Sequence, residues 1–180
     1  LAIVLASYRF TRYRDGSDKQ ITLEVPEGVD GEELSHVIEG VFLARDLINT
    51  PANDMGPDEL EAAARGLAGD HGAAINVITG DDLIAQNFPL IHAVGRAAAR
   101  APRLIDITWG KDSDPRITLV GKGVCFDTGG LDIKPSSGML NMKKDMGGAA
   151  TALGLAHMIM GRGLKVRLRV LIPAVENSIS

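Results

Sequence analysis

A strand-loop-helix-strand unit between residues 116 and 172 constrains the fold of this chain more than any other feature. Arg116–Val120 and Val166–Ile172 both have the β-branched, apolar composition of strands. Between them lies an apolar stripe at helical spacing, formed by Ala149, Leu153, Ala156 and Met160. Strands joined by a helical crossover run parallel, and ligands in such folds gather at the carboxyl ends of the strands. The sequence therefore predicts a functional loop that begins at Gly121.

Helices and strands also alternate upstream of this unit. Strand patterns cover Ile21–Val25, Ala74–Ile78 and Arg103–Trp109. Helical patterns cover residues 34–49, residues 57–72 and a segment that starts at Gly80. The alternation predicts an α/β fold with a largely parallel sheet that is flanked by helices on both faces.

The first fifty residues have a different character. Leu1–Phe10 has the pattern of the last turns of a helix or of a short apolar strand, and with Ile21–Val25 it forms an unfinished unit. We interpret the helix over residues 34–49 as a connection between this unit and a larger domain. Because the chain begins with leucine, we expect that it starts inside a longer protein.

Composition excludes several classes of function. The 180 residues include 19 Lys and Arg against 23 Asp and Glu, a net charge of −4, so no basic excess is available to neutralise a phosphate backbone. The single cysteine, Cys125, cannot form an intrachain disulfide, which favours a cytoplasmic protein. The longest nearly uncharged stretch, Gly147–Gly161, is too short for a membrane helix.

Charged residues interleaved with glycines follow the strand Arg116–Val120. They are Lys122, Asp127, Lys134 and Asp145. Carboxylates from one crossover can converge on a divalent cation, which would allow both aspartates to stay ionised near each other. A phosphate-binding loop is the competing interpretation, but that motif requires Ser or Thr directly after its lysine, and Gly123 follows Lys122.

Taken singly, each residue of this region also fits a role without a ligand. Asp145 could cap the following helix, and Asp127 could form an Asx turn with the residues Thr128–Gly130. The remaining side chains could be solvated or packed in the core without a further role; they are Lys122, Lys134, Met142, Cys125 and His157.

Read as one string, residues 121–135 and 142–150 resemble the leucyl aminopeptidase family, also called cytosol aminopeptidases. The family motif runs approximately G-K-G-x-x-F-D-[ST]-G-G-x-x-x-K-P and then M-x-x-D-M-G-G-A-A, and this chain matches it nearly position for position. Residues 45–53 resemble the family's entry into its catalytic domain, and Tyr8–Tyr13 resembles the end of its amino-terminal domain. The resemblance therefore covers almost the entire chain.

The resemblance implies three regions in this chain. Residues 1–32 would be the end of the amino-terminal α/β domain, residues 33–50 a connecting helix, and residues 51–180 the first part of the metallopeptidase catalytic domain. It also implies a cytoplasmic homohexamer that hydrolyses the amino-terminal residue, leucine or another apolar one, from peptides.

The resemblance also implies roles for individual residues. Lys122, Asp127 and Asp145 match positions that bind one of two adjacent divalent ions, zinc or manganese, with Asp127 bridging both. Lys134 matches a catalytic lysine that polarises the scissile carbonyl, and Met142 lines the pocket for the first side chain of the substrate. Lys122, Asp127 and Lys134 would touch the substrate as well.

These roles are chemically reasonable. Lys122 must be a neutral amine to act as a ligand, and two nearby dications would lower its pKa enough to supply one. Lys134 should remain a cation, because it would stabilise the oxyanion that forms during hydrolysis.

The family completes its site with a segment N-T-D-A-E-G-R-L that does not occur in these 180 residues. That segment supplies an aspartate and a glutamate as further ligands and an arginine that holds a bicarbonate base. We therefore expect residues 1–180 by themselves to be inactive. The alternative function is a non-catalytic or DNA-binding regulatory protein on the same fold, although the acidic balance disfavours DNA binding.

Overall fold

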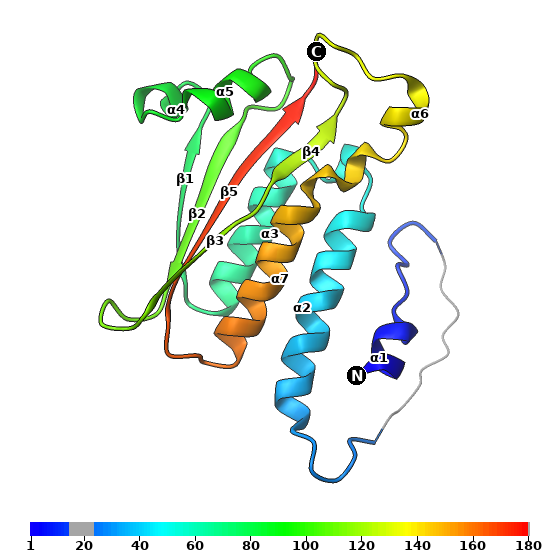
Figure 1. Ribbon diagram of the computed structural model, residues 1–180, viewed down its shortest axis with the longest axis vertical. Coiled ribbons are helices and arrows are strands. Elements are labelled where there is room, and N and C mark those ends of the chain that lie inside the picture. Colours follow the sequence, from blue (N-terminus) through cyan, green and yellow to red (C-terminus); the bar gives the residue numbers. More distant parts are fainter. Residues whose placement is uncertain (15–23, 180) are drawn as a thin grey trace.

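The computed structural model describes residues 1–14 and 24–179, and it shows one mixed β-sheet packed against helices (Figure 1). The helices are α1 (Ala2–Ser7), α2 (Gly31–Asn49), α3 (Pro57–Asp70), α4 (Asp82–Ala85), α5 (Pro89–Gly95), α6 (Ser136–Met139) and α7 (Gly147–Gly161). The short 3-10 helices are η1 (Ala52–Asp54) and η2 (Met142–Met146). The strands are β1 (Ala74–Thr79), β2 (Arg103–Trp109), β3 (Arg116–Val120), β4 (Gly123–Asp127) and β5 (Arg167–Asn177).

The sheet confirms the α/β class but is mixed rather than largely parallel. Its order is β1-β2-β5-β3, with β4 also paired to β5. Strands β3 and β4 run parallel to β5, whereas the β1/β2 and β2/β5 pairs are antiparallel. The reason is the short turn between β2 and β3, which reverses the chain direction. Because β5 inserts between these two strands, it is parallel to one and antiparallel to the other.

Strand β4 corrects the expectation that a loop begins at Gly121. Only Gly121 and Lys122 separate β3 from β4. Both strands pair in parallel with β5, β3 along its first part and β4 along its last part. Gly121 is required here, because a Cβ at this position would lie 2.6 Å from the Cα of Ala149 in α7. Asp127 consequently ends a strand, at the edge where ligands collect in α/β folds.

The main core lies between the sheet and helices α3 and α7. Alternate residues of the central strands point into it, and both helices contribute one apolar face. Fully buried members include Leu60, Ile105, Ile107, Leu153, Leu168, Val170 and Ile172. Helix α2 packs on the outer side of α7, and Asp30 caps it by accepting hydrogen bonds from the N–H groups of Glu32 and Glu33.

The opposite face of the sheet is covered only in part. Helices α4 and α5 pack there over a small apolar cluster of Ile78, Leu83 and Leu104. Further along this face Asp106 and Arg169 form an ion pair at 2.7 Å. The prediction of helices on both faces is therefore confirmed, although α4 and α5 cover only part of this face.

Most of the predicted elements are confirmed. The helix of residues 34–49 begins three residues earlier than predicted, and Leu1–Phe10 contains the short helix α1. The first three residues of the predicted strand Ile21–Val25 lie outside the described part of the chain. Within that part, no helix is long and apolar enough to cross a membrane.

Candidate metal centre

The four charged residues of the motif form two lysine-aspartate pairs. The Nζ atom of Lys122 lies 2.8 Å from Oδ2 of Asp145, and the Nζ atom of Lys134 lies 2.5 Å from Oδ2 of Asp127. Lys122 lies at the junction of β3 and β4, Asp127 ends β4, and Asp145 lies in η2, which packs along β4. The fold thus brings together residues that are 23 and 7 positions apart, each time as a pair of opposite charge.

Asp145 does not cap α7. Met146 occupies the N-cap position, and no side chain caps the helix. The Oδ2 atom of Asp145 is buried and accepts no hydrogen bond from any residue that the structure describes, because the nearby Lys122 ammonium lies outside hydrogen-bonding geometry. The negative charge of this buried oxygen faces the Lys122 ammonium, and a bound cation could take the place of that ammonium. The donor set therefore fits a divalent metal.

Asp127 forms the Asx turn that its sequence predicts. Its Oδ1 atom accepts hydrogen bonds from the N–H of Gly129 at 2.9 Å and from Nδ2 of Asn177 at 2.7 Å. Burial opposes ionisation of this carboxyl, but the hydrogen bonds from Lys134, Gly129 and Asn177 outweigh burial and lower its pKa. The turn fixes one oxygen and leaves Oδ2 directed at a cation, so the Asx turn and a ligand role are compatible.

A tight loop returns the chain so that Lys134 faces Asp127. Gly129 has φ of +92°, and a Cβ there would lie 2.2 Å from the carbonyl oxygen of Asp132. The N–H of Lys134 donates to the carbonyl of Thr128, whose own N–H donates to the carbonyl of Asn177, both at 2.9 Å. The end of β5 therefore anchors the loop that carries the predicted catalytic lysine.

Met142 begins η2 and is half-buried. A cavity of about 580 Å³ adjoins the loop, but Met142 and the four charged residues do not line it. Phe126 and Thr128, the two neighbours of Asp127, do line it. Since side chains alternate along a strand, the cavity and the Asp127 carboxylate lie on opposite sides of the end of β4. The substrate-pocket role of Met142 stays a prediction.

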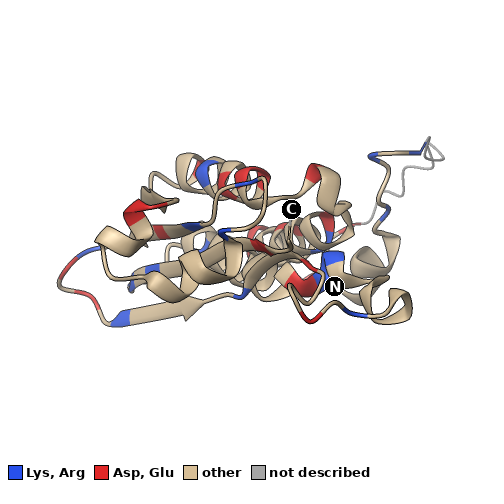
Figure 2. Ribbon diagram, turned by 90° about the horizontal axis from the view of Figure 1, so that it is seen from above, with Lys and Arg blue, Asp and Glu red and all other residues tan. Residues whose placement is uncertain are grey.

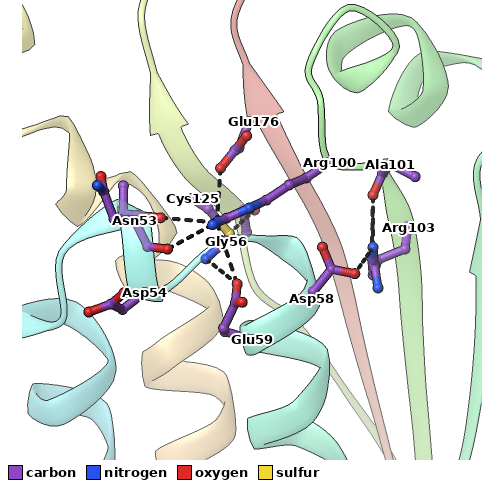
Figure 3. Close-up of polar contacts among 12 residues, drawn as sticks. Asn53, Asp54, Gly56, Asp58, Glu59, Arg100, Ala101, Arg103, Cys125 and Glu176 are labelled. Atoms are coloured by element: carbon purple, nitrogen blue, oxygen red, sulfur yellow. Dashed lines mark hydrogen bonds and ion pairs between the residues drawn. The ribbon is translucent and has the colours of Figure 1, made fainter.

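The role of Arg100 becomes visible only in the structure (Figure 3). Its guanidinium donates to the carbonyl of Asn53 at 2.7 Å and lies 3.4 Å from carboxylate oxygens of both Glu59 and Glu176. It thereby joins η1, the start of α3 and the end of β5. Burial raises the pKa of Glu176, and the charge of Arg100 only partly offsets that effect. Because these contacts join segments far apart in the sequence, no local pattern could have revealed them.

Cys125 is confirmed as a core residue. It is fully buried in β4, and burial raises the pKa of its thiol to about 12. The thiol therefore stays protonated at neutral pH and is not a nucleophile.

Comparison with known proteins identifies the family. A sequence profile described as the cytosol aminopeptidase family, catalytic domain, matches residues 42–180. This chain belongs to the cytosol aminopeptidase family. A curated relative, the probable cytosol aminopeptidase of Syntrophotalea carbinolica, is 39% identical over 191 residues, which cover 97% of this chain and 38% of the relative.

Solved structures of cytosol aminopeptidases share the fold. The crystal structure of the cytosol aminopeptidase of Coxiella burnetii matches with a TM-score of 0.94 and 54% identity, over 99% of this chain and 39% of that chain. The bottromycin maturation enzyme BotP, solved in complex with Mn, matches with a TM-score of 0.87 and 36% identity, over 97% of this chain and 38% of that chain. This chain thus spans about two fifths of the length of these relatives.

Proposed function

We propose that the protein is a metal-dependent aminopeptidase that releases leucine or another apolar residue from the amino terminus of peptides. The observation that carries the proposal is the arrangement of the four motif residues in two lysine-aspartate pairs at the end of β4 and in η2, in a member of the cytosol aminopeptidase family. The names of the relatives support the same reaction.

Two divalent ions, zinc or manganese, would be held by Lys122, Asp127 and Asp145 together with ligands from outside residues 1–180. When bound, the ions supply an activated water and stabilise the charge that develops on the scissile carbonyl. The Mn complex of BotP supports this choice of metal. Asp127 would help to hold both ions, and two hydrogen bonds, from the N–H of Gly129 and from Asn177, fix the orientation of its carboxylate.

Lys122 and Lys134 would exchange their present partners for the reaction. With both ions in place, Lys122 would leave its ion pair with Asp145, lose one proton to solvent and help to hold an ion as a neutral amine. Lys134 would leave Asp127, keep its proton and point its ammonium at the carbonyl oxygen of the substrate. A fixed positive charge at that oxygen is worth most where negative charge develops in the transition state. Met142 would line the pocket for the first side chain.

The rest of the assembly follows the family pattern in this proposal. Residues 1–32 would end an amino-terminal domain, residues 33–50 would connect it to the catalytic domain, and residues 51–180 would form the first part of that domain. The remaining acidic ligands and an arginine that holds bicarbonate would come from the segment N-T-D-A-E-G-R-L. The protein would be cytoplasmic, in keeping with its single buried cysteine and the names of its relatives, and would form a homohexamer as the family resemblance implies.

The charge distribution over residues 1–14 and 24–179 does not favour the DNA-binding alternative. Lys and Arg segments are interspersed with Asp and Glu segments around the fold (Figure 2). The net charge is −4. A nucleic-acid surface requires a concentration of positive charge on one face.

The proposal is tested with Lys134→Ala in the complete protein and Lys144→Ala as the matched control on the exposed side of η2. We expect kcat for leucine-anilide hydrolysis to fall by roughly 10²–10³-fold in Lys134→Ala with metal content unchanged, the usual loss for one oxyanion donor. Lys144→Ala should match the wild type. A normal kcat with a raised KM would show that Lys134 only holds the substrate. Binding of DNA in a gel shift without metal-dependent turnover would favour the alternative.

A further inference from the structure

Three ionisable side chains meet at the interface of α2 and α7, away from the motif residues. His36 and Glu39 lie one turn apart on α2, and His157 projects from α7. The Nε2 atom of His157 lies 3.0 Å from Oε2 of Glu39, and Nδ1 of His36 lies 3.9 Å from the same oxygen. All three of these atoms lie within 4.8 Å of one another.

Glycines on both helices set this geometry. A Cβ on Gly40 would lie 2.5 Å from the carbonyl oxygen of Gly154, so the two helices approach closely at this point. Glu39 and His157 lie beside this crossing. One turn further, a Cβ on Gly161 would lie 2.5 Å from Nδ1 of His36, so only glycine leaves room for that ring. The ring nitrogen is thereby held inside the interface.

Two features of the cluster point to a ligand. Nδ1 of His36 is buried and has no hydrogen-bond partner among the described residues, which is costly for a ring nitrogen. The second ring nitrogen of His157 lies 3.1 Å from Nε2 of His71, at the end of α3. A hydrogen bond on the far nitrogen of a histidine is the arrangement that orients metal-bound imidazoles.

We propose that His36, Glu39 and His157 bind a divalent transition metal ion, zinc by preference, which clamps α2 to α7. Two imidazoles and a carboxylate are a donor set that suits zinc. Donor atoms in a tetrahedral zinc site are about 3.3 Å apart for bonds of about 2.0–2.1 Å. Oε2 of Glu39 lies 3.0 Å from Nε2 of His157 and 3.9 Å from Nδ1 of His36, one distance below and one above that value. Small rotations of the side chains therefore complete the site. Water fills the fourth position.

An approach route exists beside the cluster. His36 and Gly161 line an open pocket of about 320 Å³ whose other walls include Asp30, Glu32 and Glu33. Arg162 also lines the pocket and pairs with Glu33 at 2.8 Å, so the carboxylates of Asp30 and Glu32 leave the lining with a net negative charge that attracts a cation. The site is separate from the motif residues and does not depend on the proposed reaction.

The test is the zinc content of the complete protein after equilibration with zinc and removal of loose metal, measured by mass spectrometry of the element. We expect His36→Gln and His157→Gln each to lose one zinc per chain relative to the wild type. His92→Gln is the matched control, because His92 is also half-buried and lies 3.2 Å from a carboxylate, Asp81, on the other side of the sheet. It should keep the wild-type content.

Glu39→Gln covers the case in which a histidine variant fails to fold. The Glu39 side chain is 57% exposed, so its replacement leaves the packing intact. We expect at least a tenfold weaker affinity for that one zinc, together with unchanged hydrolysis of leucine-anilide. The proposal is overturned if Glu39→Gln and the folded histidine variants hold as much zinc as the wild type with the same affinity. The outcome for Asp127→Asn does not affect zinc binding by His36, Glu39 and His157. The proposed aminopeptidase function and the proposed zinc site can therefore fail independently of each other.

Discussion

Replacing Gly129 by alanine should disable the site without removing its chemical groups. Gly129 has φ of +92°, outside the range that L-residues adopt readily, and forcing a side chain there costs about 1–3 kcal/mol. The added Cβ would also lie 2.2 Å from the carbonyl oxygen of Asp132. That neighbour is backbone, so no side-chain rotation relieves the overlap. The loop must move by about 1 Å to restore ordinary contact, and such a displacement of a catalytic group can lower a rate by about 10²-fold.

The assay compares Gly129→Ala with Gly138→Ala in the complete protein. A Cβ on Gly138 would have its nearest neighbour at 3.7 Å, so the control adds the same methyl group a few residues away without a clash. We expect Gly129→Ala to lower the free energy of unfolding by about 1–3 kcal/mol and kcat by about 10²-fold, with most bound metal retained. The control should stay within about 0.5 kcal/mol of the wild type. Wild-type kcat and stability in Gly129→Ala would refute the assigned role of the loop in placing Lys134.

Two further predictions concern stability and the extent of the site. Arg103 is buried and pairs with Asp58 and Glu61 at 2.6 and 2.5 Å, so Arg103→Met should cost about 2–3 kcal/mol in urea unfolding, against about 0–0.5 for the exposed Arg65→Met. Burial opposes ionisation of Glu61, but the hydrogen bonds and charges of Arg103 and Arg65 outweigh burial and hold the pKa of Glu61 below the ordinary 4.5. The ionised Glu61 carboxylate therefore makes its full contribution to the free energy of unfolding above pH 4.5, and that contribution is lost as the pH falls through the pKa of Glu61 in the folded protein. Equal losses of stability in Arg103→Met and Arg65→Met would contradict this account. So would the same dependence of stability on acid pH in the wild type and Arg103→Met. Residues 1–180 expressed alone with excess zinc or manganese should not hydrolyse leucine-anilide. Turnover equal to that of the complete protein would point to Asp132 or Glu176 as additional ligands.

Local patterns predicted most of the elements because each depends on its own residues. The strands Arg103–Trp109 and Arg116–Val120 have the predicted bounds, since β-branched runs between turn residues define them without help from the rest of the fold. Strand β4 was missed, because its five residues lie between the glycines of a predicted loop and become a strand by pairing with β5. The mixture of parallel and antiparallel pairs likewise depends on the position of β5 between β2 and β3. That position is a contact between segments far apart in the sequence, so a local pattern cannot predict it.

The candidate site shows the same division. The motif named the four charged residues, but not that each lysine would pair with an aspartate or that Asn177 would hold Asp127. The two roles without a ligand that the sequence allowed had different outcomes. Asp127 forms the Asx turn, whereas Asp145 does not cap the following helix. Arg100 and the α2/α7 cluster stayed hidden, because both are assembled from segments that only the tertiary structure brings together.

The central claim is that Asp127 holds metal in this site, and the metal content of purified Asp127→Asn in the complete protein tests it most directly. Asp132→Asn, an exposed position in the same loop, is the control and should keep both metal and turnover. Because Asp127 would bridge both ions, we predict that Asp127→Asn loses bound metal and leucine-anilide hydrolysis together. Full metal occupancy in Asp127→Asn would contradict the account and leave Asp127 with its Asx turn alone.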